Sequence, residues 1–184
     1  RSYYNVNAVP TMFLDGKSTL APQTQLDLDQ SLSQSTFLNI QGAFNVEGNT
    51  INVTADFMAY SDIANAKAYI AVNEKTTTGN VGTNGEKEFH HIMMKMLTSA
   101  QGESISINAG EIHHFEYSFD MSSTHVEEMS DLEVAMWLQN PTTKEVYNSK
   151  FAMEYTEHLY AVENLSAEIV GDAVIFVINW NKPE

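Results

Sequence analysis

The strongest constraint on the fold is a series of short segments with partly alternating hydrophobicity, each bounded by Gly, Asn, Ser or Pro. The first two, Phe37–Val46 and Thr50–Tyr60, are joined by Glu47-Gly48-Asn49, which is typical of a β-hairpin turn. Six more follow in the order AKAYIAVNEK, FHHIMMKML, ESISI, EIHHFEYSF, LEVAMWLQN and EVYNSKFAM. Short strands separated by turns predict an all-β sandwich of about 7–9 antiparallel strands over residues 36–158.

Two segments leave helix and strand open at this stage. FHHIMMKMLTSA would suit a helix, although Gly102 and the β-rich flanks favour a strand. In residues 18–35, Leu28 and Leu32 are four apart, as in a short helix, whereas QLDLDQ alternates like a strand. We expect residues 18–35 to be a linker or edge segment.

The charge and residue composition exclude several classes of function. The 184 residues include 9 Lys and Arg against 24 Asp and Glu, a formal charge of −15. Such a surface repels nucleic acid and anionic lipid, so the expected partner is a protein or a glycan. Without cysteine there is no disulfide, thiolate chemistry or Cys-ligated zinc. No apolar run reaches the roughly 18 residues that span a bilayer.

The first residues predict a piece of a different domain. Tyr4–Gly16 reads as one strand, with Val9-Pro10-Thr11 before Met12-Phe13-Leu14 and a turn at Asp15-Gly16. This stretch resembles the thioredoxin segment in which a cis-proline faces the redox cysteines. Residues 1–17 are therefore predicted to be the tail strand of a thioredoxin-like domain, left unpaired, disordered or borrowed by a neighbour. Since the chain begins at Arg1, we expect a fragment of a longer protein, with no function for Pro10 in the absence of cysteine.

A second resemblance covers about residues 36–153. YIAVNEK, EFHHIMMKMLTSAQGESISI and DLEVAMWLQNPTTKEVYNS resemble the 28-kilodalton outer membrane protein family of Bacteroidetes. Lys95 stands where an arginine is commoner in that family. The resemblance implies an immunoglobulin-like sandwich after a thioredoxin-like domain, in a protein that is extracellular, on the cell surface or in the periplasm.

The last residues, 159–184, read as a strand, a Gly-Asp turn and a second strand that carries Trp180. They resemble the start of a fibronectin type III domain, in which Leu165 and Trp180 would be core residues. The alternative is that they are the last strands of the sandwich. Two strands alone are rarely stable, so either assignment requires a packing partner.

The histidines form the first candidate site. They occur as doublets, His90-His91 and His113-His114, and neighbours on a strand point to opposite faces. If the two strands lie side by side, one histidine from each would converge with Glu111 or Glu116 as zinc ligands. The alternative, which we prefer, is that they are ordinary surface or half-buried histidines.

Other chemistry has weaker support in the sequence. The acidic stretches Asp27-Leu28-Asp29 and HVEEMSDLE lack the spacing of a calcium loop and are interpreted as solvated faces. There is no Gly-X-Ser-X-Gly elbow or phosphate-binding loop. The long loop TTTGNVGTNGE is the preferred contact region, because loops often carry binding surfaces. We expect seven large residues to pack in the core: Met93, Met94, Met96, Tyr117, Phe119, Met136 and Trp137.

These observations predict a non-catalytic accessory or interaction sandwich of a secreted or envelope multidomain protein, with no catalytic, cofactor-binding or metal-binding residue. One alternative is the C-terminal accessory domain of a thiol-disulfide oxidoreductase, marked by an upstream Cys-X-X-Cys, or of a surface peptidase. Another is a carbohydrate-binding module, which would need exposed aromatic residues in a row. Exposed strand edges would allow an oligomer.

Overall fold

The computed structural model describes residues 24–82 and 84–155, together with Tyr4, Val6, residues 13–18 and the strands 166–170 and 173–177. The chain divides into two compact units, Arg1–Glu154 and Tyr155–Glu184, and each is described by itself.

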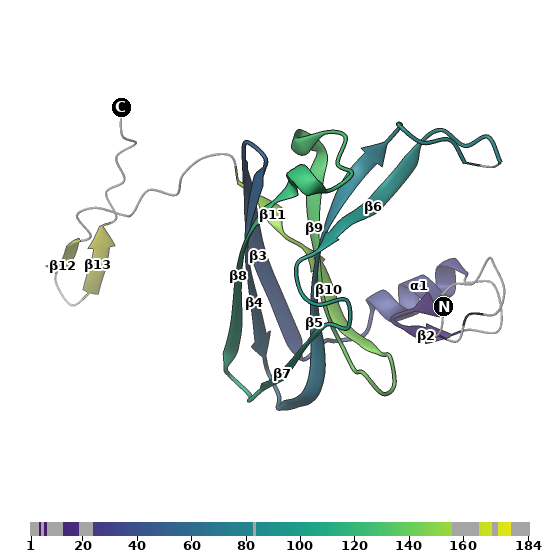
Figure 1. Cartoon of the computed structure of the whole chain (residues 1–184). Coiled ribbons are helices and arrows are strands. Elements are labelled where there is room, and N and C mark those ends of the chain that lie inside the picture. The colour runs from purple at the N-terminus through teal and green to yellow at the C-terminus, as the bar shows by residue number, and fades with distance from the viewer. Residues whose placement is uncertain are drawn as a thin grey trace. The chain divides into compact units, whose positions relative to one another are not determined.

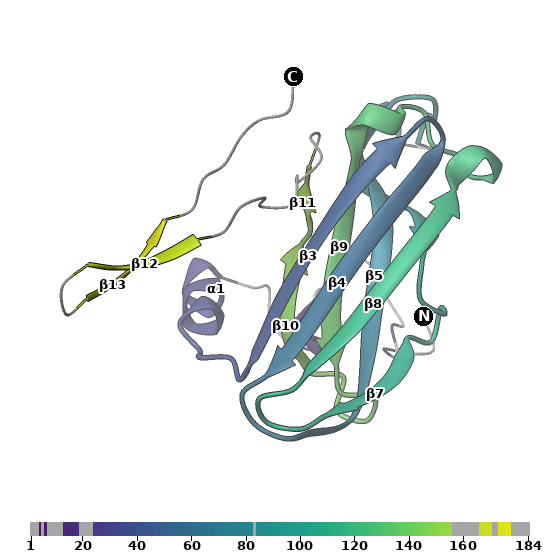
Figure 2. The same ribbon diagram turned by 90° about the vertical axis from the view of Figure 1, so that its left-hand side faces the viewer.

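The first unit contains a β-sandwich of two sheets (Figures 1 and 2). The four-stranded sheet has the order β11-β3-β4-β8, and the five-stranded sheet has the order β10-β9-β5-β6, with β7 also pairing with β5. The strands of the four-stranded sheet are β3 (Leu38–Glu47), β4 (Thr50–Ala59), β8 (Ile112–Asp120) and β11 (Met153–Glu154). The five-stranded sheet contains β5 (Ile63–Thr77), β6 (Phe89–Met96), β7 (Glu103–Ile107), β9 (Leu132–Gln139) and β10 (Val146–Phe151).

This architecture confirms the all-β prediction. The segment FHHIMMKML forms strand β6 and not a helix. Every pairing in the two sheets is antiparallel except that of β11 with β3, which is parallel. Strands β3, β4 and β8 lie in one sheet, whereas β5, β6 and β9 lie in the other. This distribution is that of an immunoglobulin-like sandwich.

The core lies between the sheets and follows the period-2 alternation of the strands. On β4 every second residue is buried: Ile51, Val53, Ala55, Phe57 and Ala59. On the facing sheet the buried residues include Ile70, Val72, Val134, Met136 and Leu138. Each large side chain buried in this way stabilises the fold by about 1.5–3 kcal/mol.

The predicted core residues divide into three groups. Met136 is fully buried, and Met94, Tyr117 and Phe119 pack against the core. Met93 was predicted wrongly: it is 57% exposed, because β6 is an edge strand and Met93 pairs with Asn73 away from the other sheet. Trp137 and Met96 are only half-buried.

Trp137 shares its face with Tyr69, which is its pairing partner on β5. The two rings are stacked with centroids 4.9 Å apart on the side of the sheet that faces away from the core. Tyr69 is nevertheless only 5% exposed, because its hydroxyl donates to the carbonyl of Gln101 and Gly102 packs on its ring.

Within residues 18–35 the structure has a helix, α1 (Gln25–Leu32). Thr24 caps it: the Thr24 side chain accepts from Asp27 N–H, and Asp27 accepts from Thr24 N–H at 2.7 Å. Hydrogen bonds from the hydroxyl and the backbone of Thr24 hold the pKa of Asp27 below its usual value. Asp27 is therefore a capping residue. Leu26, Leu28 and Leu32 are all exposed.

Two short strands precede α1. β1 (Phe13–Leu14) and β2 (Lys17–Ser18) pair antiparallel through Asp15 and Gly16, both with positive φ. The expectation of a strand unpaired within the chain is thus wrong for β1, whose partner is the next strand along the sequence. Pro10 lies outside the described residues.

In the second unit, β12 (Ser166–Val170) and β13 (Ala173–Val177) form an antiparallel pair, which matches the predicted strand–turn–strand pattern. Leu165, Trp180 and Pro183 lie outside the described residues.

Candidate functional site

The candidate site is on the solvent side of the five-stranded sheet, here called the outer face. Residues that pair across antiparallel strands share a face, so the register shows which side chains meet there. One row runs from Met93 through Asn73 to Glu133, and the next from Phe151 through Ala135 to Ala71. The outer face therefore combines an apolar strip with a polar row.

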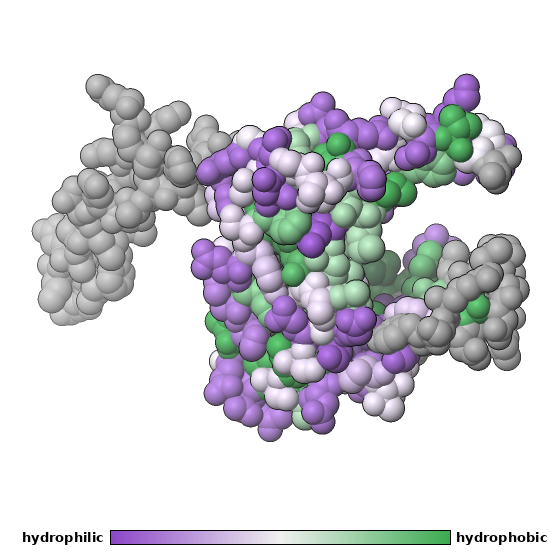
Figure 3. All heavy atoms as spheres, viewed as in Figure 1, coloured by the Kyte–Doolittle hydropathy of each residue, from purple (hydrophilic) through white to green (hydrophobic). Residues whose placement is uncertain are grey.

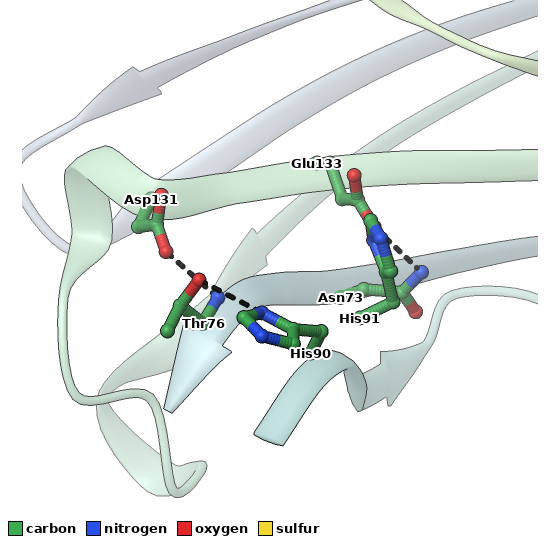
Figure 4. Close-up of polar contacts among 6 residues, drawn as sticks. All are labelled: Asn73, Thr76, His90, His91, Asp131 and Glu133. Carbon is green, nitrogen blue, oxygen red and sulfur yellow. Dashed lines mark hydrogen bonds and ion pairs between the residues drawn. The ribbon is translucent and has the colours of Figure 1, made fainter. Parts of the chain in front are cut away.

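His91, Glu133 and Asn73 form the polar centre of this face (Figure 4). His91 Nδ1 lies 2.7 Å from Glu133 Oε1, and Asn73 Nδ2 donates to the same oxygen at 3.3 Å. His91 has φ +54°, a left-handed conformation that is rare inside a strand and that costs about 1–3 kcal/mol. The ring of His91 also stacks on that of Phe151, with centroids 6.3 Å apart.

His90 points toward different partners (Figure 4). Its Nδ1 lies 3.3 Å from Thr76 Oγ1, and its Nε2 lies 3.0 Å from Glu88 Oε1. A hydroxyl, an imidazole and a carboxylate in this order have the connectivity of a catalytic triad. However, the side chains of His90 and Glu88 are both more than half exposed, and the groove on the outer face described below is lined by other residues.

A buried carboxylate fastens the loop after β8 to the end of β5. Glu74 has no exposed surface. Its carboxylate accepts from Glu127 N–H at 3.0 Å and from Glu128 N–H at 2.6 Å. In the opposite direction, the carboxylate of Glu127 accepts from the N–H groups of Thr78 and Gly79. We call this reciprocal arrangement the carboxylate latch (Glu74, Thr78, Gly79, Glu127 and Glu128).

The carboxylate latch predicts a pH effect. Hydrogen bonds from the backbone of Thr78 and Gly79 lower the pKa of Glu127 below its ordinary value of 4.5. A lowered folded-state pKa contributes stability that is present above pH 4.5 and is lost as the pH falls through the lowered value. We expect hydrogen exchange at Thr78 and Gly79 to accelerate in that range, after correction for intrinsic rates. In Glu127→Gln, which cannot ionise, the acceleration should be absent; an equal acceleration in both proteins would contradict this.

The acidic stretch HVEEMSDLE does not converge on a cation. Glu128 accepts from Ser130 and Asp131 accepts from Thr76 N–H, while Glu127 and Glu133 have the partners given above. Asp29 accepts from Gln25. Within the part of the chain that the structure describes, no group of three or more His, Asp or Glu residues is placed to hold a metal ion.

The two histidine doublets lie in different sheets, so the condition for the zinc hypothesis is not met. His90 and His91 are on β6, whereas His113 and His114 are on β8. His114 Nδ1 pairs with Asp56 at 2.6 Å, and the His113 ring packs on Phe115. Glu111 accepts from the side chain of Asn108, and Glu116 is exposed on β8.

Lys95 and Tyr117 join the sheets near β6 and β7. Lys95 lies over the ring of Phe119, 4.2 Å from its centroid. Tyr117 donates to Glu103 at 2.8 Å. Burial first, and then this hydrogen bond and the charge of Glu103, raise the pKa of Tyr117 far above its usual value, so the hydroxyl stays protonated.

A groove of about 450 Å³ opens on the outer face next to the N-terminal hairpin. Phe13, Asp15 and Gly16 line one side, and the sheet lines the other with Ala135, Trp137, Phe151 and their neighbours. The volume is in the range of ligand sites, and the lining is mostly apolar. Sequence reasoning missed this groove, because it depends on the contact between residues 13–16 and β9–β10.

No family model and no curated protein sequence matches the chain. None of the helices among the described residues is long and apolar enough to cross a membrane. Solved structures do match. HBP35 of Porphyromonas gingivalis is 13% identical with a TM-score of 0.59, over 98% of this chain and 66% of that one. A domain of the outer membrane lipoprotein Omp28 from Porphyromonas gingivalis is 13% identical with a TM-score of 0.47, over 66% of this chain and 92% of that one.

The sporulation control protein Spo0M from Bacillus subtilis is 12% identical, with a TM-score of 0.36 over 67% of this chain and 51% of that one. The chain thus spans about two-thirds of the length of HBP35. At this level of identity the likeness to HBP35 shows the fold alone.

Proposed function

We propose that the sandwich is a non-catalytic accessory or interaction domain of a secreted or envelope multidomain protein. The observation that carries this proposal is an incomplete second element held against the sandwich: β1, β2 and α1, here called the hairpin–helix segment (residues 13–18 and 25–32). Two contacts attach this segment and Tyr4, which precedes it, to strands β9 and β10 of the five-stranded sheet. Val146 N–H donates to the carbonyl of Asp15 at 2.9 Å, and Gln139 Nε2 lies 2.6 Å from the Tyr4 hydroxyl.

The hairpin–helix segment has the character of a fragment. Its strands have two residues each, and isolated hairpins are marginal in water. The helix exposes all three of its leucines, with Leu32 84% exposed, although Leu28 and Leu32 are four apart on one helix face and such a pair is normally buried against a core. Ser31 Oγ donates to the Asp15 carboxylate and ties the helix to the hairpin.

We therefore propose that the hairpin–helix segment belongs to a larger α/β domain. The hairpin is followed directly by a helix, and residues 1–17 carry the thioredoxin-like resemblance; we therefore assign α1, within the segment predicted as a linker or edge, to the same domain as the hairpin. The likeness to HBP35, a chain about half as long again, supports a protein with more than one domain. The resemblance to the Bacteroidetes outer membrane family favours the bacterial envelope as its location.

Catalysis by the sandwich itself has less support. His90 and Glu88 are mostly exposed to solvent, and within the described part of the chain the His91–Glu133 pair has no hydroxyl as a hydrogen-bond partner. A glycan platform is also disfavoured, because Tyr69, in line with Trp137, is covered by the loop around Gly102.

The non-catalytic assignment is tested with the chain itself on chromogenic ester and peptide substrates. We expect no turnover that depends on His90. His114→Ala is the matched control, since His114 is also an exposed histidine paired with a carboxylate but has no hydroxyl partner among the described contacts. Turnover that is abolished by His90→Ala and kept in His114→Ala would overturn the assignment.

The oxidoreductase alternative is tested by the sequence upstream of Arg1 and by the activity of the full gene product. A Cys-X-X-Cys some tens of residues upstream of Arg1, together with reduction of insulin disulfides by the full gene product, would place the chemistry in the neighbouring domain. The sandwich would then be its accessory domain.

A further inference from the structure

Part of the outer face carries exposed apolar side chains that the described chain leaves uncovered. Phe151 is 53% exposed and Met93 is 57% exposed. His91, two residues before Met93 on β6, has its ring stacked on Phe151. We call these three residues the outer patch. Single exposed apolar residues are ordinary, but here two large ones lie on the two edge strands of one sheet face, and one of them is stacked with an imidazole from the other edge.

Other residues of this face are already covered, among them Tyr69 and Gln139. The loop around Gly102 packs on Tyr69, and the contact between Gln139 and Tyr4 leaves Gln139 only 1% exposed. A sheet with residues buried on both of its faces is usual where a second layer packs on it. The outer patch takes Phe151 from the apolar strip and Met93 and His91 from β6, and these side chains lack such a layer among the described residues.

The outer patch is continuous with the contact of the hairpin–helix segment. The groove next to the hairpin has Phe13 and Gly16 on one wall and Phe151 on the other. The hairpin contact is close: a Cβ on Gly16 would collide with the carbonyl of Lys144. Figure 3 shows hydrophobic residues in the recess on the right of the view, between the projecting β6 hairpin and the N-terminal segment.

We propose that the outer patch is the docking surface for the body of the domain that contains the hairpin–helix segment. This inference rests on the proposed function. That body must lie beside Phe13 and the exposed leucines of α1 to bury them. The neighbouring apolar surface of the sandwich is the outer patch. A second copy of the chain is the less favourable occupant, because each copy carries a formal charge of −15.

The test compares methionine oxidation by dilute hydrogen peroxide in the 184-residue chain and in the full gene product, read by mass spectrometry. Met93 and Met153 are both more than half exposed, and Met153 lies on β11 in the other sheet. We expect both to oxidise readily in the 184-residue chain. In the full gene product the oxidation rate of Met93 should be about tenfold lower, which corresponds to a free energy of about 1.4 kcal/mol for opening the interface. The oxidation rate of Met153 should be unchanged.

The second part of the test uses the variant Phe151→Ser, which removes an apolar side chain of the outer patch. In the full gene product it should restore oxidation of Met93 to the rate of the 184-residue chain. The matched control is Ile112→Ser, which replaces another exposed residue on the four-stranded sheet and should leave the protection intact.

Three outcomes would overturn the inference. The first is an equal oxidation rate of Met93 in the two proteins, and the second is protection of Met93 that persists in Phe151→Ser. The third is protection of Met93 in the 184-residue chain that rises with protein concentration, which would assign the outer patch to a second copy. If the upstream gene encodes no α/β domain, the proposed function fails as well. If it encodes one and Met93 is unprotected, only the docking surface fails.

Discussion

Glu74→Ala is expected to lower the free energy of unfolding by about 3 kcal/mol, since hydrogen bonds to a charged group contribute about 1.5–3 kcal/mol each and orphaned donors add to the loss. Glu74 is fully buried and accepts from the N–H groups of Glu127 and Glu128. Alanine removes the acceptor from both amides and leaves a cavity at the end of β5. Urea denaturation measures the change directly.

Glu74→Gln separates the effect of losing the charge from the effect of losing the hydrogen-bond acceptor. Its amide oxygen can still accept from both N–H groups, as Glu74 Oε1 does, but the charge that strengthens these bonds is lost, so we expect roughly half of the alanine effect. Glu116→Ala is the control: Glu116 is exposed on β8, and its removal should change stability by less than about 0.5 kcal/mol. A Glu74→Ala protein as stable as the control would show that water replaces the carboxylate, and the carboxylate latch would then have no energetic role.

The carboxylate latch illustrates what the sequence can and cannot predict. The alternation Ile70, Val72, Glu74 places Glu74 on the core side of β5, so its burial was accessible from the sequence. Its partners were not, because the loop of residues 126–128 is 53 residues away along the chain and comes to β5 only through the pairing of β9 with β5.

The histidines and methionines of β6 show the same limit more clearly. The strand itself was predictable, from turn signals and β-rich flanks. Its place at the edge of the five-stranded sheet was not, and that place exposes Met93 and turns His91 toward Glu133. Since β8 belongs to the other sheet, the four histidines could be separated into two unrelated surfaces only from the strand order.

Trp137 shows a second limit of prediction from the sequence: an apolar residue in a strand need not lie in the core. A tryptophan in an alternating strand was interpreted as core, yet its neighbours Met136 and Leu138 take the inward positions. Either phase of the alternation in LEVAMWLQ gives an apolar face, with Val134, Met136 and Leu138 on one side and Ala135 and Trp137 on the other. Apolar residues in both phases of a strand indicate a sheet that is partly covered on its second side, as Tyr69 and Gln139 are on the outer face.

Gly42→Val is expected to destabilise the sandwich by about 2 kcal/mol, within the range for overpacking a well-filled core. A Cβ at Gly42 would lie 2.5 Å from the sulfur of Met136 and 2.8 Å from the carbonyl oxygen of Thr54. Met136 is fully buried and has little room to move, and the Thr54 carbonyl is part of the strand paired with β3. The glycine of β3 thus makes the space that a long side chain of the facing sheet fills.

The pairing of Gly42 with Met136 can be measured by a double-mutant cycle in thermal or urea unfolding. Met136→Ala alone should cost about 2–5 kcal/mol through the cavity that it leaves. In the double variant the valine would occupy part of that cavity, so the combined loss should be smaller than the sum of the two single losses by about 1 kcal/mol or more. Strictly additive losses would mean that the clash with the Thr54 carbonyl dominates, and the two sheets would then be matched at this point by backbone geometry and not by the complementary sizes of glycine and methionine.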